Sequence, residues 1–221
     1  MSDRLYFYLG RALPILVFGL LVAIQAQLAY AGLQHALSGQ LDRSQSMYLI
    51  NRVLVVAFFT FLLVIYALRS KAARWDYNPL AIVAAMVGSF VLYTLYIFPG
   101  QARSTDLRVL ALSDILLAIG MVWALYGLSY LRNRFSIVPE ARELVTSGPY
   151  AVVRHPVYLG EIIAGIGLVI PTIFSLHAVI LAVFIGAQLL RIHFEERVLQ
   201  SAFPTYEVYA RRTKRLIPFI Y

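Results

Sequence analysis

Long apolar runs separated by short polar segments dominate the pattern of hydrophobic and polar positions along the chain. A helix that crosses a bilayer core of about 30 Å needs roughly 20 apolar residues. Four runs approach this length with at most one charge each, namely Ala12–Gln34, Val53–Leu68, Leu80–Phe98 and Val109–Leu131. We therefore predict four membrane-spanning helices in an N-terminal region, residues 1–131.

Two shorter apolar runs follow, Val157–Ile170 and Ser175–Leu190, with a turn between them that begins at Pro171. At about 1.5 Å per residue each helix is roughly 21 to 24 Å long, and tilting or packing against neighbours accommodates such a length. The expected fold is an all-α integral membrane protein with about six transmembrane helices, the last two forming a short hairpin. The C-terminal region, residues 132–221, is expected to hold a polar loop, this hairpin and an amphipathic helix.

Composition and charge support this layout. Hydrophobic residues make up 61% of the chain and charged residues 14%, and 19 Lys and Arg oppose 11 Asp and Glu. Basic residues collect in cytosolic connecting segments. Six alternating spans place Arg43, Arg52, Arg103 and Arg108 on one side and all other basic residues on the opposite side. We therefore expect a multi-pass protein with both termini in the cytosol, and we assign the positive charge to topology and membrane lipids, with no nucleic acid as partner.

Two polar segments, 132–156 and 192–221, are long enough to carry chemistry, and both lie on the predicted cytosolic side. The chain has no Cys, which excludes structural disulfides, thiolate metal sites and a cysteine nucleophile. The spacing of His, Asp and Glu predicts no metal site. A reaction centre is therefore expected at the cytosolic face, beside the hairpin.

The first polar segment carries the sequence LVTSGPYAVVRHPVYLG at 144–160. The S-G-P at 147–149 indicates a turn, and Pro156 suits the first position of a helix, where its missing N–H costs nothing. Arg154 and His155 then stand at a helix N-terminus, whose unpaired N–H groups attract carboxylates and phosphates. The alternative is a basic anchor where a helix meets the lipid headgroups.

The second polar segment carries Arg191, His193, Glu195 and Glu196 directly after the last predicted span. Aromatic and basic residues follow, which is also typical of an interfacial amphipathic helix. Two adjacent carboxylates next to a membrane surface favour a function, because anionic lipids repel them.

Together the two segments resemble the isoprenylcysteine carboxyl methyltransferase family and its phospholipid methyltransferase relatives. The resemblance rests on G-P-Y-x-x-x-R-H-P-x-Y-x-G at 148–160, the hairpin, R-x-x-x-E-E at 191–196, the aromatic residues after it, and I-P at 217–218. It covers roughly residues 142–220. The first three spans resemble no family that we assign.

This resemblance implies S-adenosylmethionine as the cofactor, in a cytosolic pocket built from the loop before the hairpin and the C-terminal helix. The residues that it implies for this pocket are Arg142, Glu143, Leu144, Val145, Tyr150, His155, Pro156, Val157, Tyr158 and Glu195. Arg191 matches a position associated with the methyl acceptor. Relatives often have His where Arg142 stands, and Gly where this chain has Pro204.

Methyl transfer from a sulfonium mainly requires that donor and nucleophile be held about 3 to 3.5 Å apart with water excluded. Arg191 can orient a carboxylate acceptor in a bidentate manner, and no base is then needed. An amine or thiol acceptor needs deprotonation, for which Glu196, His155 and His193 are candidates. The sequence leaves these acceptors open.

The sequence thus predicts a membrane methyltransferase that uses S-adenosylmethionine and acts on a lipophilic acceptor from the bilayer. Its expected activity is most like that of protein-S-isoprenylcysteine carboxyl O-methyltransferase. The alternatives are a phospholipid amine or thiol methyltransferase, an NADPH-dependent membrane reductase of the sterol type, and a small transporter or scaffold in which both clusters are only anchors. The oligomeric state stays open.

Overall fold

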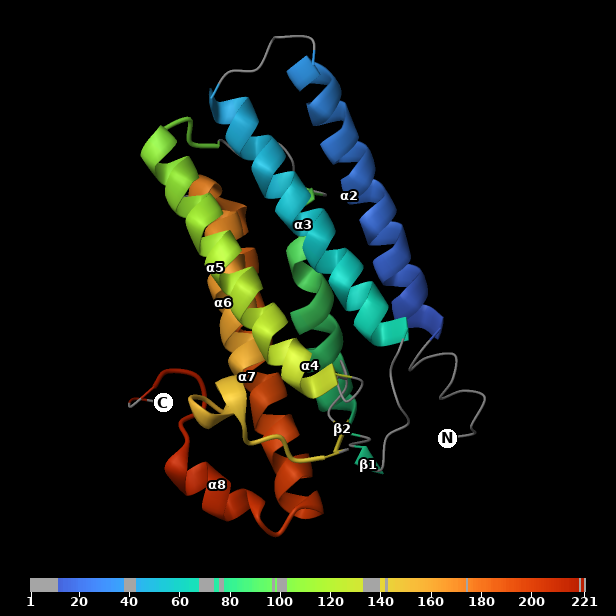
Figure 1. Ribbon diagram of the computed structural model, residues 1–221, viewed down its shortest axis with the longest axis vertical. Helices are drawn as coiled ribbons and strands as arrows, with labels where there is room; N and C mark the ends of the chain where they lie inside the picture. Colours follow the sequence, from blue (N-terminus) through green and yellow to red (C-terminus); the bar gives the residue numbers. More distant parts are fainter. Residues whose placement is uncertain are drawn as a thin grey trace.

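The structure, a computed structural model, describes residues 12–37, 43–67, 74–75, 78–96, 98, 103–132, 140–141, 143–173, 175–218 and 220. Long helices run side by side along the long axis of the molecule, and short elements gather at one end (Figure 1). In the described N-terminal part of the chain, the helical elements are α2 (Leu13–Leu37), α3 (Arg43–Ala67), α4 (Pro79–Phe90), η2 (Val91–Tyr96) and α5 (Leu107–Leu131).

The C-terminal part begins with a single 3-10 turn, η4 (Gly148–Ala151), which leads into the hairpin. The hairpin comprises α6 (Pro156–Val169), η5 (Ile170–Thr172) and α7 (Leu176–Ala202), and the chain then forms α8 (Tyr206–Arg212). As predicted, Pro156 is the first residue of its helix. We call the end of the bundle that carries α8 the α8 end.

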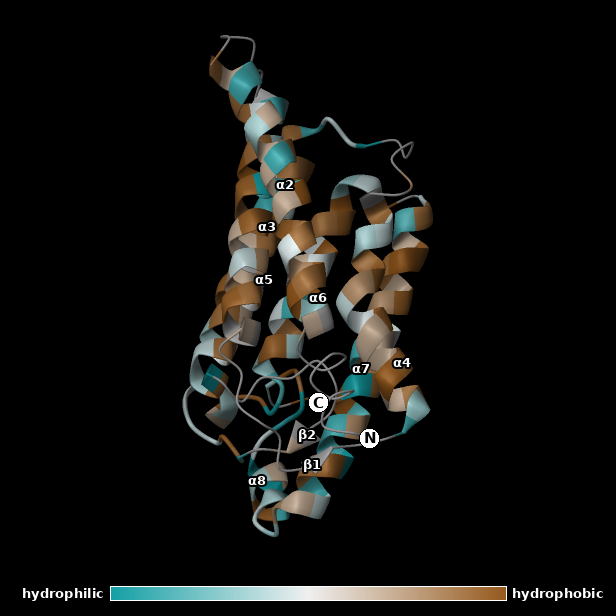
Figure 2. Ribbon diagram, turned by 90° about the vertical axis from the view of Figure 1, so that its right-hand side faces the viewer, coloured by the Kyte–Doolittle hydropathy of each residue, from teal (hydrophilic) through white to brown (hydrophobic). Residues whose placement is uncertain are grey.

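The helices have the length and composition of an all-α integral membrane protein, as predicted. Within the residues that the structure describes, three helices are long and apolar enough to cross a membrane: Pro14–Leu37, Leu107–Leu131 and Leu176–Ala202. Shorter apolar helices cover Tyr48–Phe61, Pro79–Leu95 and Pro156–Thr172. Figure 2 shows hydrophobic residues along the helices and hydrophilic residues toward both ends of the bundle, including the α8 end.

Two predicted helix boundaries were wrong because charged residues had been placed in loops. Helix α3 begins at Arg43, ten residues before the predicted start at Val53. It includes Arg52, whose buried guanidinium donates a 3.0 Å hydrogen bond to the Gln25 side chain of α2. Helix α7 continues twelve residues beyond Leu190, which places Arg191 and the two glutamates on a continuous helix.

Glycines bring α5 and α6 into backbone contact. A Cβ added at Gly120 would lie 2.5 Å from the Gly160 carbonyl oxygen, and one added at Gly160 would lie 2.5 Å from that of Gly120. Farther along the pair, the Ser113 hydroxyl donates a 2.7 Å hydrogen bond to the Gly167 carbonyl. Small residues of this kind allow close helix packing in membranes, so α6 is held firmly against α5.

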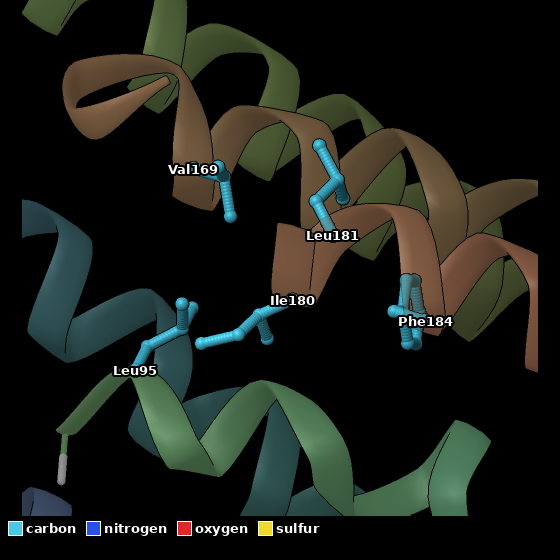
Figure 3. Packing of buried hydrophobic residues seen from close by; sticks show 5 residues of the cluster. All are labelled: Leu95, Val169, Ile180, Leu181 and Phe184. Carbon is cyan, nitrogen blue, oxygen red and sulfur yellow. The ribbon is translucent and has the colours of Figure 1, made fainter. Parts of the chain in front are cut away.

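The other side of the hairpin packs on the segment formed by α4 and η2. Figure 3 shows the apolar cluster that joins them, in which Leu95 faces Ile180. Val169, Leu181 and Phe184 complete its buried part. The hairpin is thus packed between two parts of the N-terminal region, which fixes the positions of the polar residues at its ends.

One short pair of strands lies at the α8 end and was not predicted. Strands β1 (Arg74–Trp75) and β2 (Glu140–Ala141) pair antiparallel, with Arg74 opposite Ala141 and Trp75 opposite Glu140. They join the segment between the second and third predicted spans to the segment that leads into the hairpin. The two strands therefore lie together at this end of the bundle (Figure 1).

Candidate functional site

A charged cluster surrounds Glu196 at the α8 end. One carboxylate oxygen of Glu196 accepts a 2.8 Å hydrogen bond from Nε of Arg154 and lies 3.3 Å from Nε2 of His155. The other accepts a 2.9 Å hydrogen bond from Nε of Arg215. The Glu196 side chain is 6% exposed. We call Arg154, His155, Glu196 and Arg215 the clasp, because they join three segments distant in sequence.

Besides its contact with Glu196, Arg154 caps the C-terminal end of α8. Its Nη1 donates a 2.8 Å hydrogen bond to the Ala210 carbonyl and another to the Thr213 carbonyl. Carbonyls at a helix C-terminus lack helical partners, and a cation there also interacts favourably with the helix dipole. Arg154 thus connects α8 with the N-terminus of α6.

Backbone hydrogen bonds hold the chain after α8 beside the N-terminus of α6. The Arg154 amide donates a 2.7 Å bond to the Lys214 carbonyl, and the His155 amide donates a 3.0 Å bond to the Arg215 carbonyl. The last turn before the hairpin and the segment after α8 therefore fold as one unit.

Two tyrosines, the buried Tyr150 and the half-buried Tyr209, support this unit. The Tyr209 hydroxyl donates a 2.7 Å hydrogen bond to the Tyr150 carbonyl. Burial raises the pKa of the Tyr209 phenol above its ordinary value, although nearby Arg154 opposes the shift. Burial also raises the pKa of Tyr150, with Glu195 adding to the effect. Both phenols therefore stay neutral at physiological pH.

A second polar network lies inside the hairpin, around the buried guanidinium of Arg191. Its Nη1 donates a 2.8 Å hydrogen bond to Oε1 of Gln188 and lies 3.6 Å from Oε2 of Glu161. Nε2 of Gln188 donates to that same Glu161 oxygen. Cζ of Arg191 lies 4.7 Å from the centroid of the Tyr158 ring, within the range of a cation–π contact.

Tyr158 connects this network with Glu195. Its hydroxyl donates a 2.7 Å hydrogen bond to Oε2 of Glu195 while its ring contacts Arg191. We call Tyr158, Glu161, Gln188, Arg191 and Glu195 the hairpin network. The centroid of the His155 ring lies 5.7 Å from that of Tyr158, so the hairpin network adjoins the clasp.

Helix α4 covers the hairpin network with a glycine. A Cβ added at Gly88 would lie 2.8 Å from Cδ of Arg191 and 2.9 Å from Oε1 of Gln188. A helix bearing a larger residue there would have to displace one of these two side chains. The N-terminal region therefore contributes directly to the position of Arg191.

The structure places most of the residues that the sequence indicates at the α8 end. Tyr150, His155, Pro156, Val157 and Tyr158 are buried around the N-terminus of α6. Half-buried residues are Leu144, Val145 and Glu195, whereas Glu143 is exposed. The predicted cofactor residue Arg142 lies outside the described residues.

The sequence analysis missed or left without a role three residues of these clusters, Arg215, Glu161 and Gln188, and the neighbouring Gly88. Glu161 and Gln188 lie within apolar runs, and a polar side chain within a membrane span is a functional candidate by default. That signal was available for these two. Nothing local marks Gly88 or Arg215, because their contacts depend on the tertiary fold.

Residues 109–206 match the family model described as phospholipid methyltransferase, a segment from α5 to the start of α8. The apolar helices and this match give the chain the class of a helical membrane protein similar to phospholipid methyltransferases. The predicted resemblance is confirmed at the level of the phospholipid methyltransferase family, over a segment that carries the hairpin network and every clasp residue except Arg215.

Two curated relatives match a similar share of the chain. The chain is 33% identical to the cobalt-zinc-cadmium resistance protein CzcN of Cupriavidus metallidurans over 139 residues. These residues cover 60% of this chain and 61% of the relative. The chain is 32% identical to the nickel-cobalt-cadmium resistance protein NccN of Alcaligenes xylosoxydans xylosoxydans over 136 residues. These residues cover 60% of this chain and 62% of the relative. The match thus spans about three fifths of these relatives. Among the residues that the structure describes, no group of three or more His, Asp and Glu side chains is placed to hold a metal ion.

Proposed function

We propose that this protein transfers a methyl group from S-adenosylmethionine, taken up from the cytosol, to a lipophilic acceptor that enters from the bilayer. The observation that carries the proposal is the position of Tyr158, whose hydroxyl contacts Glu195 and whose ring contacts Arg191. The resemblance associates Glu195 with the cofactor and Arg191 with the acceptor. One buried side chain therefore lies between the residues proposed to hold the two reactants.

The residues around Tyr158 suit the cofactor chemically. The half-buried Glu195 carboxylate complements an ammonium group, and the neutral rings of Tyr150 and Tyr158 complement an adenine. The N-terminus of α6, which follows His155, favours a carboxylate. When bound, the cofactor supplies an electrophilic methyl group. The protein orients both reactants and excludes water, which suits the buried surroundings of this site.

We assign Glu196 a structural role, although the sequence marked it as a candidate base for an amine or thiol acceptor. Its carboxylate already contacts Arg154, His155 and Arg215. Cationic neighbours stabilise the ionised form of a carboxylate and so make it a weak proton acceptor. Glu196 instead holds the segments that carry Tyr150 and His155 against α7.

The orientation in the membrane is part of the proposal. We propose that the α8 end faces the cytosol and that both termini lie on that side, with six helices crossing or entering the bilayer. The basic residues of the clasp gather at this end, in agreement with the positive-inside rule. A water-soluble cofactor then reaches the site directly, while the acceptor approaches through the lipid.

The test is calorimetric titration of the detergent-purified protein with S-adenosylhomocysteine, with NADPH in parallel. We expect saturable binding of S-adenosylhomocysteine, weakened in Glu195→Ala and His155→Ala. Arg191→Ala is expected to keep this binding and to lose methyl transfer to extracted membrane lipids. Binding of NADPH alone would favour the reductase, and binding of neither ligand by a folded sample would favour an anchor or scaffold.

The two curated relatives favour a second role, in resistance to metal ions, because their names assign them to resistance against cobalt, cadmium and other metals. We propose that methyl transfer to a membrane component underlies any such role of this chain. Cells that produce the wild-type protein should then tolerate more cobalt and cadmium than cells that produce Glu195→Ala at the same level. Equal tolerance in the two strains would separate methyl transfer from metal resistance.

A further inference from the structure

Helix α2 is the least covered of the three long helices described above. It packs mainly on α3, at the edge of the bundle (Figure 1). Only 11% of its most apolar stretch is buried, against 33% in α5 and 44% in α7. In a membrane this exposed surface faces either lipid or another protein, and its chemistry indicates which of the two it fits.

Two glutamines of α2 point to opposite sides of the helix, because residues two apart on an α-helix point about 200° apart. Gln25 faces α3, where it is buried and accepts the hydrogen bond from Arg52. Gln27 is exposed on the other side, and within the described part of the chain its amide has no hydrogen-bond partner. The packing of α2 on α3 thus satisfies one of these two amides and leaves the other outside.

The Gln27 amide lies at a depth that water does not reach. It stands two residues from the midpoint of α2 (Leu13–Leu37), which is about 3 Å along the helix axis. Because α2 is long and apolar enough to cross a membrane, this amide falls near the centre of the hydrocarbon. Lipid tails offer neither donor nor acceptor, so an amide there gains most by a hydrogen bond to another helix.

The side of α2 that carries Gln27 has the spacing of a helix–helix contact. Steps of four and three residues alternate along it, which is the pattern of left-handed helix pairs. We call these positions the α2 seam; all are exposed, and they are Leu16, Leu20, Ala23, Gln27, Tyr30, Gln34 and Leu37. Gln27 is the middle position of the seam. A polar residue within such a seam fixes the register in which two helices pair.

We propose that two copies of this chain associate in the membrane through the α2 seam, with the Gln27 amide hydrogen-bonded to Gln27 of the partner subunit. A primary amide is both donor and acceptor, so it is complementary to itself. Copies inserted in one membrane share their orientation and depth. A two-fold axis along the membrane normal therefore brings equal positions of α2 together as parallel helices. An unrelated helix would need a matching polar residue at the same depth.

The proposed contact lies away from the candidate site. Neither the clasp nor the hairpin network contains a residue of α2, so each copy keeps a complete site. The inference therefore does not rest on the proposed function, and it holds for any activity of the chain.

Disulfide cross-linking tests the inference cleanly, because the chain has no Cys of its own. Single cysteines are introduced at two seam positions, as Ala23→Cys and Tyr30→Cys, and at two exposed positions off the seam, as Leu28→Cys and Leu33→Cys. The whole chain is reconstituted in phosphatidylcholine liposomes at a low protein-to-lipid ratio, oxidised briefly and separated by non-reducing electrophoresis. We expect at least about tenfold more covalent dimer from the seam positions, because a disulfide needs Cα atoms within about 7 Å of each other.

Further changes in the Ala23→Cys background test the Gln27 amide itself. Gln27→Leu removes the amide, and we expect half-maximal cross-linking to need an about tenfold higher protein-to-lipid ratio. Gln27→Asn keeps an amide and should retain most of the cross-linking. Leu33→Ala changes an exposed residue off the seam and serves as the control, which should cross-link like its parent. Circular dichroism of each variant verifies that the helices are formed.

Three results would overturn the inference. Equal cross-linking at seam and off-seam positions would indicate random collision, and no covalent dimer from a folded protein would leave lipid as the cover of α2. Unchanged cross-linking in Gln27→Leu would remove the amide contact on which the proposal depends. If Gln27→Leu does not fold, the comparison of seam with off-seam positions decides.

Discussion

The adjacent residues Glu195 and Glu196 belong to two different regions of the molecule. Successive residues of an α-helix point about 100° apart, so one helix presents the two carboxylates to separate surroundings. Glu196 lies in the clasp, where it contacts Arg154, His155 and Arg215. Glu195 lies in the hairpin network, where it accepts a hydrogen bond from the Tyr158 phenol and remains half-buried.

This difference teaches that two neighbouring residues of the same type, Glu195 and Glu196, can have different roles. The clasp uses its carboxylate to hold three segments together, and every contact of Glu196 described above is with the protein itself. The hairpin network leaves its carboxylate partly accessible beside a neutral phenol. A ligand at Glu195 would meet the Tyr158 phenol, whereas at Glu196 it would have to compete with two guanidinium groups.

The largest effect is expected from Glu196→Ala. Removing one partner from a buried ionic cluster leaves the others uncompensated, and we expect a loss of about 3 kcal/mol of stability. Thermal unfolding in detergent, followed by circular dichroism, measures it. Glu207→Gln, which removes an exposed carboxylate, serves as the control and should change stability by at most about 0.5 kcal/mol. An unfolding temperature for Glu196→Ala equal to that of the control would show that the clasp does not stabilise the fold.

A smaller effect, confined to ligand binding, is expected from Glu195→Gln. The amide keeps the size of the side chain and can still accept from Tyr158, so stability should stay within about 1 kcal/mol of wild type. Loss of the charge should weaken S-adenosylhomocysteine binding about tenfold or more, because hydrogen bonds to charged groups are the strong ones. Calorimetric titration measures the dissociation constant of S-adenosylhomocysteine for the wild type and for the variant. Equal affinity in wild type and variant would remove Glu195 from the proposed cofactor site.

Gly88→Ala tests whether the N-terminal region positions Arg191. The added methyl group would meet Arg191 and Gln188 at less than 3 Å, so these side chains must shift. We expect methyl transfer to slow several-fold while S-adenosylhomocysteine affinity changes little, since a small displacement of a positioned group costs rate. The control is Gly186→Ala, whose Cβ would meet nothing within 4 Å. Equal transfer rates in both variants would contradict the role of α4.

The smallest effect is expected from Tyr209→Phe. This change removes only the hydrogen bond to the Tyr150 carbonyl, a contact worth about 1 kcal/mol or less. Chemical unfolding should show a small loss of stability, with S-adenosylhomocysteine affinity reduced by less than about threefold. A tenfold loss of affinity would instead indicate that the Tyr209 hydroxyl contacts the ligand.

The apolar runs predicted the helices because a membrane span must be long and hydrophobic, but they could not locate every boundary. Arg52 looked like a loop residue, yet it is buried in α3 because Gln25, which lies in another helix, accepts its hydrogen bond. Only the packing of α2 against α3 creates this partner. Charged residues that find partners on other helices are therefore where predictions from hydropathy fail.

The motifs located the site but not the division of roles within it. The sequence grouped Arg191 and Glu196 as catalytic candidates, whereas the structure places them in different clusters. The partners that separate them are Glu161 and Gln188 for the first and Arg215 for the second. These contacts join residues on different elements or on different turns of α7, so their geometry depends on how the hairpin and the segment after α8 pack.

The backbone bonds from Arg154 and His155 to Lys214 and Arg215 also set a time order for biosynthesis. About 60 residues separate the two halves of this contact, and a ribosome needs roughly 3 to 12 s to add them. During that interval the hairpin can enter the membrane while its polar end still lacks the hydrogen bonds to Lys214 and Arg215. A nascent chain therefore gains the complete site only after translation has passed Arg215, and a stop codon between Ala202 and Lys214 would yield an inserted but open bundle.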